Sequence, residues 1–261
     1  MAKRAAEVTM WAVFRVEFYY TEPMPKELTA AAFAKEIRAN QSDEELRKIR
    51  RYFKSGEGEY GEGDVFIGVR MGTIFDVAKS FVDMPPAEIE ILLDNDIHEM
   101  RVGALSIMEK QFRAKKTTEP RKKELYELYL RRHDRIDNWD LVDLAARHVV
   151  GGYLADKPRD ALYRLAVSAN MWERRTAMFA TAYFVKNGEV DDVYKLAKLL
   201  LADPEDLIHK VVGGMLRSAG TVDAERLVVF LDEHARLMPR TMLRYAIEHF
   251  TPEQRTMYLS R

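Results

Sequence analysis

The sequence contains no cysteine, which excludes disulfides, thiolate metal ligands and a cysteine nucleophile. Its net charge is only −1, with 41 Lys and Arg against 42 Asp and Glu. A polyanionic partner therefore requires a local basic patch. No apolar run is long enough to span a bilayer. Charged residues interrupt the N-terminal region, so we expect no secretion signal, no membrane association and a cytoplasmic location.

The composition is that of a globular protein large enough to bury a substantial core. Hydrophobic residues make up 47% of the 261 residues and charged residues 32%. Prolines 23 and 25 end an aromatic-rich segment. We predict that residues 1–25 are an N-terminal extension forming a capping helix, with a non-native extension as the alternative. Residues 26–261 are expected to form a single domain.

Helical periodicity begins near residue 26 and continues almost to the C-terminus. The segments are short, roughly three to four turns, and are joined by turns that carry Asp, Pro or Gly. Helix pairs recur about every 35 to 45 residues, which is the range of HEAT-type units. We predict an all-α fold, a HEAT-like helical-repeat solenoid (an α–α superhelix) with one concave groove.

One long irregular stretch contains a literal G-x-G-x-x-G at Gly56, Gly58 and Gly61. A dinucleotide site would need a buried strand before it and a helix starting at the last glycine. A charged helical segment precedes this stretch instead, and its several carboxylates would repel a pyrophosphate. We therefore predict a surface loop that packs Tyr60 and Phe66 against neighbouring helices.

The segment 138–143, Asn-Trp-Asp-Leu-Val-Asp, includes one of only three tryptophans. Asn138 is a good N-cap, and Asp140 would lie in the first turn, where negative charge is favourable. In a helix running to about Leu154, Trp139 and Asp143 share one face because they are four residues apart. An indole beside a carboxylate on one helix face marks a candidate working surface.

Basic residues recur on helices that follow this one. Arginine suits phosphate because its planar fork donates two parallel hydrogen bonds. Gly213 and Gly214 lie inside one of these helices, at a cost of roughly 1 kcal/mol each relative to Ala. A close approach by another backbone would explain them, and so would simple tolerance of glycine. The candidate phosphate-binding residues are Arg174, Arg175, Lys210, Arg217, Arg240 and Arg244.

An ordered set of motifs carries a family resemblance. These motifs are Tyr52-Phe53-Lys54, residues 59–64 (EYGEGD), residues 138–143, Trp172-Glu173-Arg174-Arg175 and residues 208–217. In this order they resemble the HEAT-like-repeat DNA alkylation-repair glycosylases of the AlkD type, over about residues 26 to 255. The resemblance implies hydrolysis of the N-glycosidic bond of cationic N3- or N7-alkylated purines in duplex DNA, without extrusion into a deep pocket.

The resemblance also implies roles for individual residues. Asp143 and Trp139 would form the catalytic face, and Arg175 would contact the DNA backbone. The family commonly has a tryptophan at the position of Gly214, so here the cleft lacks one aromatic wall. The chemistry agrees, because an alkylated purine is already a good leaving group and a carboxylate stabilises an oxocarbenium-like sugar.

Simpler interpretations remain beside this one. Asp143 could form an ordinary helix-surface ion pair with Arg147, Trp139 could be a core residue, and the arginines could be solvated. A catalytically weak or inactive DNA-binding relative, or a HEAT-like scaffold that recognises acidic peptides, are the alternative functions. The six histidines show no metal-ligand spacing. We expect no metal, no cofactor and a monomer.

Overall fold

The structure, a computed structural model, describes residues 26–56 and 59–260. The capping helix expected in residues 1–25 lies outside this range. The first half of the described chain contains α1 (Ala30–Arg38), α2 (Asp43–Tyr52), α3 (Met71–Lys79), α4 (Pro86–Leu93), α5 (His98–Arg113), α6 (Glu119–Arg131), the 3-10 turn η1 (His133–Arg135) and α7 (Trp139–Ala145). The second half contains the π-helical η2 (Ala146–Gly152), α8 (Asp160–Ala166), α9 (Met171–Ala180), α10 (Ala182–Lys186), α11 (Asp191–Leu199), α12 (Asp206–Gly220), α13 (Ala224–His234), α14 (Arg240–Ala246) and α15 (Pro252–Leu259).

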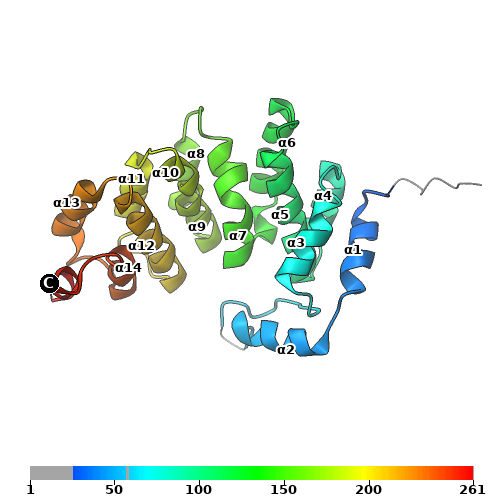
Figure 1. The fold of residues 1–261 in the computed structure, drawn as a ribbon, viewed down its shortest axis with the longest axis horizontal. Helices are drawn as coiled ribbons and strands as arrows, with labels where there is room; N and C mark the ends of the chain where they lie inside the picture. Colours follow the sequence, from blue (N-terminus) through cyan, green and yellow to red (C-terminus); the bar gives the residue numbers. More distant parts are fainter. Residues whose placement is uncertain (1–25, 57–58, 261) are drawn as a thin grey trace, which may run out of the picture.

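The helices follow one another in an arc from α1 at one end to α13 and the C-terminus at the other (Figure 1). Along it, α5 packs on α3, α4 and α7, α7 packs on α9, and α12 joins α9 to α14. Across residues 26–56 and 59–260, an isolated bridge between Val65 and Ile97 is the only β pairing. The predicted all-α, HEAT-like solenoid is confirmed.

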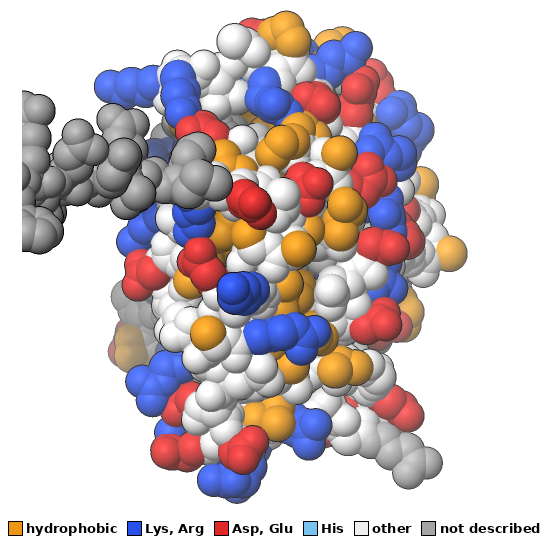
Figure 2. Space-filling model, turned by 90° about the vertical axis from the view of Figure 1, so that its right-hand side faces the viewer, with side chains coloured by type: hydrophobic (Ala, Val, Ile, Leu, Met, Phe, Trp, Pro, Cys, Tyr) orange, Lys and Arg blue, Asp and Glu red, His pale blue; other side chains and the backbone are white. Residues whose placement is uncertain are grey.

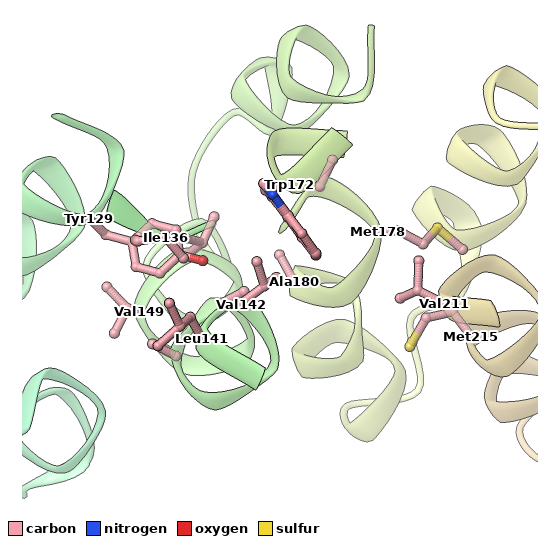
Figure 3. Packing of buried hydrophobic residues seen from close by; sticks show 14 of the residues in the cluster. Tyr129, Ile136, Leu141, Val142, Val149, Trp172, Met178, Ala180, Val211 and Met215 are labelled. Carbon is pink, nitrogen blue, oxygen red and sulfur yellow. The ribbon is translucent and has the colours of Figure 1, made fainter. Parts of the chain in front are cut away.

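A continuous hydrophobic core runs through the stack. Between α6, α7 and α9 it includes Leu141, Val142 and Ala180, each fully buried (Figure 3). Trp172 belongs to this core and is only 9% exposed, so the second tryptophan motif contributes packing rather than an open aromatic face. Burial of this apolar surface holds each repeat to the next.

Glycines allow the closest helix contacts. A Cβ at Gly213 would overlap the carbonyl oxygen of Met242, so α12 and α14 can approach this closely only with glycine there. At Gly214 a Cβ would meet nothing within 4 Å. The predicted close approach therefore explains the first of these two glycines and not the second.

The helix that begins at Trp139 reaches the expected length but changes its hydrogen bonding. From Ala146 to Gly152 it is π-helical, where the sequence pattern predicted a continuous α-helix. A Cβ at Gly151 would overlap the Ala180 carbonyl oxygen, so this segment packs directly against the backbone at the end of α9. Such π turns are frequent at functional sites.

Charges of both signs are interspersed with hydrophobic side chains over the end of the molecule at α1 (Figure 2). Many cations are paired, as Arg132 is with Asp94 and Lys116 with Asp83. Among the helices of the described residues, none is both long and apolar enough to cross a membrane.

Candidate functional site

A cleft of about 510 Å³ opens on the stack where α7, α9, α12 and α14 meet the end of α2. Trp139 and Asp143 line it from α7, and Arg175 lines it from α9. The structure therefore brings together the three residues that the sequence singled out. A second, more apolar pocket of about 580 Å³ lies beside it and shares Tyr52 and Trp139 as walls.

Trp139 is positioned by the start of α7. The side chain of Asn138 accepts the Trp139 backbone N–H at 2.8 Å, as the expected N-cap. The indole stacks on Phe53 with ring centroids 5.6 Å apart, and its Nε1–H donates to the Tyr60 hydroxyl at 3.3 Å. The ring is partly buried and lines the cleft, so its orientation is fixed while one side remains accessible.

Asp143 is bound to Arg175, not to Arg147. The Arg175 Nε and Nη2 groups donate to the two carboxylate oxygens at 2.9 and 2.8 Å, and Nη1 donates to the Leu207 carbonyl at 2.8 Å. The ordinary helix-surface pair with Arg147 was the wrong interpretation. Because the two partners are 32 residues apart, the pair ties α7 to α9 and α12.

Burial and the arginine act in opposite directions on Asp143. Removal from water raises the pKa of this carboxyl above its ordinary value, the Arg175 guanidinium lowers it, and the nearby Asp140 carboxylate raises it. The net direction is upward. The side chain is still 25% exposed, whereas that of Arg175 is only 9% exposed, so the carboxylate is the more accessible part of the pair.

Lys210 and Arg217 also line the cleft, both from α12. Lys210 forms an ion pair with Asp206 at 2.7 Å, and Arg217 is paired with Glu248. Both side chains remain partly exposed. Their positive charge faces the same space as the Asp143–Arg175 pair.

The other three predicted basic residues do not line the cleft. Arg174 binds Asp203 through Nε and Nη2 at 2.6 and 3.2 Å and donates to two backbone carbonyls, so its contacts are structural. Arg240 donates to the Leu259 carbonyl and fixes α15 to α14. Arg244 is exposed on α14 outside the cleft.

Several cleft residues were not identified as site residues from the sequence. Tyr60, expected only to pack a loop, holds the indole by a hydrogen bond. Lys54 and Tyr245 also line the cleft. Tyr245 lies over Gly213, and its Cβ would be only 2.6 Å from a Cβ added at that glycine. Lys54 and Tyr60 had a signal, since both lie in the quoted motifs, whereas Tyr245 had none.

Gly214 lines the cleft, and the space above its Cα is open. A side chain at this position would therefore project into the cleft without displacing other atoms. Tyr245 lines the same cleft from α14. An aromatic side chain is thus supplied to this cleft by a neighbouring helix instead of by position 214 of α12.

A buried polar network lies next to the stacked rings of Trp139 and Phe53 and connects the residues around them. The Asp64 carboxylate accepts from Asn138 at 2.7 Å and from Arg101 at 2.6 Å, and His98 Nε2 contacts Asp140 at 2.8 Å. Burial alone would lower the pKa of His98, but the carboxylates of Asp140 and Asp64 outweigh it and raise this pKa to about 9. The network locks the loop after α2 onto the N-terminus of α7.

The fold and the cleft define a helical-repeat protein with cationic and aromatic walls around one arginine-bound carboxylate. Within residues 26–56 and 59–260, no group of three or more His, Asp or Glu is arranged to hold a metal ion. Such a cleft suits an anionic backbone that carries a flat, positively charged group.

Comparison with known proteins agrees with this class. The family model of the DNA alkylation repair enzymes matches residues 33–250, and the chain belongs to this family. Its fold is similar to that of a predicted DNA alkylation repair enzyme from Enterococcus faecalis, with a TM-score of 0.63 and 16% identity over 82% of this chain and 98% of that chain. No curated protein matches the sequence. Membership in the family makes DNA the partner and alkylation repair the role.

Proposed function

We propose that the protein is a DNA N-glycosylase that hydrolyses the glycosidic bond of cationic N3- or N7-alkylated purines in duplex DNA. The observation that carries this proposal is the Asp143–Arg175 pair beside Trp139 in an open cleft. The cleft brings a carboxylate, a cation and an aromatic face to one place, and family membership supplies the substrate class.

The reaction begins with a substrate that already has a good leaving group. When the bond from the sugar C1′ to the purine nitrogen breaks, its electron pair moves to the purine and neutralises the positive ring. The sugar becomes oxocarbenium-like, and the Asp143 carboxylate stabilises that charge. Water then attacks C1′ and loses a proton, leaving an abasic site. We propose that this proceeds without a metal or cofactor and without strand cleavage.

Arg175 can serve the carboxylate and the DNA together. A guanidinium has five N–H donors, and three of those in Arg175 bind Asp143 and Leu207. The remaining N–H groups can bind a phosphate oxygen next to the lesion while Asp143 stays in place. Lys210 and Arg217 add positive charge that can bind further phosphates. Such contacts fix the position of the protein along the duplex but do not recognise its base sequence. One chain supplies all these groups, so we propose a monomer.

The test is release of methylated purines from duplex DNA treated with a methylating agent. We expect wild-type protein to release N3-methyladenine and N7-methylguanine faster than the spontaneous rate, and to leave abasic sites in intact strands. Chromatography of the released bases measures this directly. Release no faster than in protein-free controls would reject the proposal.

Gly214 favours a second candidate function, a DNA-binding relative with little or no catalysis. Without an aromatic side chain at this position, the cleft has less surface to hold the lesion nucleotide. In that case the wild-type protein binds duplex in a salt-dependent manner without base release, and Gly214→Trp confers release. A protein that binds no duplex even at low salt would instead fit a scaffold for acidic peptides.

A further inference from the structure

α2 carries a row of cations on one face. Arg47, Arg50 and Arg51 are spaced i, i+3 and i+4, which places them along one side of α2. Lys54 follows the Phe53 C-cap, where the chain leaves the helix with a φ of 47°, and is the next cation along the chain. All four side chains are exposed. We call these four residues the α2 stripe.

The α2 stripe has no ion-pair partners among residues 26–56 and 59–260. Its neighbour Lys48 shows the contrast, since it binds Glu44 at 2.6 Å and Glu45 at 3.0 Å. Unpaired like charges at these spacings destabilise a helix. The helix dipole favours cations in the last turn, which accounts for Arg50 and Arg51 but not for Arg47.

α2 also contributes little to the core. None of its residues is buried. It is held by a hydrogen bond from Ser42 N–H to the Gly68 carbonyl, by the Glu45–Arg70 ion pair at 2.7 Å and by the rings of Tyr52 and Phe53 against Trp139. Its solvent face is the part left without a structural role.

The α2 stripe continues into the cleft. Lys54 is both its last member and a cleft-lining residue, and the 65% exposed Tyr52 lies at the same end. From Arg47 to Arg51 the helix rises by about 6 Å. Successive phosphates of one DNA strand are about 3.4 Å apart along the duplex axis, so this length matches roughly two base-pair steps.

We propose that the α2 stripe is a second phosphate-binding surface, which holds the DNA backbone outside the cleft on the side of α2. The partner is the sugar-phosphate backbone of a duplex, bound by charge and without sequence reading. The inference shares one assumption with the proposed function, namely that the damaged base lies in the cleft. Binding along α2 fixes the duplex in register with Asp143.

The test measures binding of an undamaged duplex by fluorescence anisotropy over a range of salt concentrations. The variant combines Arg47→Ala, Arg50→Ala and Arg51→Ala, and alanine keeps the helix stable. Each lost phosphate contact reduces the slope of log K against log salt by about 0.9. We expect the slope to fall by about two to three and affinity at low salt to drop at least tenfold.

The matched control combines Lys115→Ala, Lys186→Ala and Arg236→Ala, three exposed cations outside the cleft. It removes the same charge, and we expect the wild-type slope. Equal losses in both triple variants would overturn the α2 stripe as a specific surface, and so would an unchanged slope in the stripe variant. Circular dichroism confirms that both variants are folded.

A base-release assay on the same proteins separates this inference from the proposed function. An unchanged slope with active base release overturns the α2 stripe and leaves the glycosylase standing. A reduced slope in a wild type that releases no base supports the α2 stripe and overturns the glycosylase. A wild type that binds no duplex overturns both.

Discussion

At the scale of single residues, Arg175 affects Asp143 in two ways. It binds both oxygens of Asp143 and it is the cation that opposes the effect of burial on this carboxyl. A carboxylate that stabilises a developing positive charge must be ionised when the bond breaks. Arg175 therefore determines how far into the acid range the cleft stays functional, in addition to any contact with DNA.

The pH dependence of base release tests this role. Because burial raises the pKa of Asp143 and Arg175 lowers it, activity should fall as the pH drops through the folded-state pKa, above the ordinary range for Asp. In Arg175→Gln we expect the acid limb of kcat/KM to move to higher pH, since the lowering influence is lost. Arg217→Gln is the control, and an acid limb that stays in place in Arg175→Gln would contradict the role.

The two adjacent glycines of α12 give a matched pair at the same scale. Gly213→Ala places a Cβ against the Met242 carbonyl oxygen, and overpacking of this kind costs roughly 1–3 kcal/mol. Gly214→Ala meets open space and gains up to about 1 kcal/mol from helix propensity. Urea unfolding measures both, and equal stability changes in the two variants would contradict the close approach of α12 and α14.

At the scale of elements, local signals in the sequence predicted the helices well. Ser42 caps α2 by accepting the Glu45 N–H at 3.4 Å, as expected for a serine that stands three residues before a glutamate at a helix start. The Glu45 carboxylate, however, binds Arg70 at 2.7 Å, a partner 25 residues away. Caps and periodicity involve neighbouring residues and can be predicted, whereas ion pairs across helices depend on packing that a single sequence does not reveal.

The same limit applies to the candidate site. The face shared by Trp139 and Asp143 follows from helix geometry, and Arg175 follows from the family resemblance. The bond between Asp143 and Arg175 could not be predicted from the sequence, because it depends on the packing of α7 against α9. Arg174 has the same sequence signal as its neighbour but points to Asp203, because adjacent residues on a helix face different directions.

The network behind the aromatic wall predicts how stability depends on pH. The pKa of His98 is raised to about 9 in the folded protein, so the protonated form stabilises the fold fully below its ordinary value of about 6.5. This contribution is lost as the pH rises towards 9. We expect the free energy of unfolding to decline over this range in wild type, and to be flatter in His98→Gln; equal slopes would contradict the network.

At the scale of the whole molecule, the solenoid separates stability from function. The core joins each repeat to the next, while the cleft is lined by residues along α7, α9 and α12. The overall charge of −1 cannot attract DNA, so binding depends on local cations. We expect Lys210→Ala and Arg217→Ala, at partly exposed side chains, to weaken DNA binding with little effect on folding, whereas substitution of Arg175 also removes a bond between α7 and α9.

The most direct test of the account is a single-turnover assay on a duplex with one N7-methylguanine at a defined position. Wild-type and Asp143→Asn proteins are compared at a concentration that saturates the duplex, and abasic sites are detected by alkaline strand cleavage. The account predicts base release by wild type and a rate lower by about a hundredfold or more in Asp143→Asn, with duplex affinity retained. Equal rates for the two proteins would contradict it.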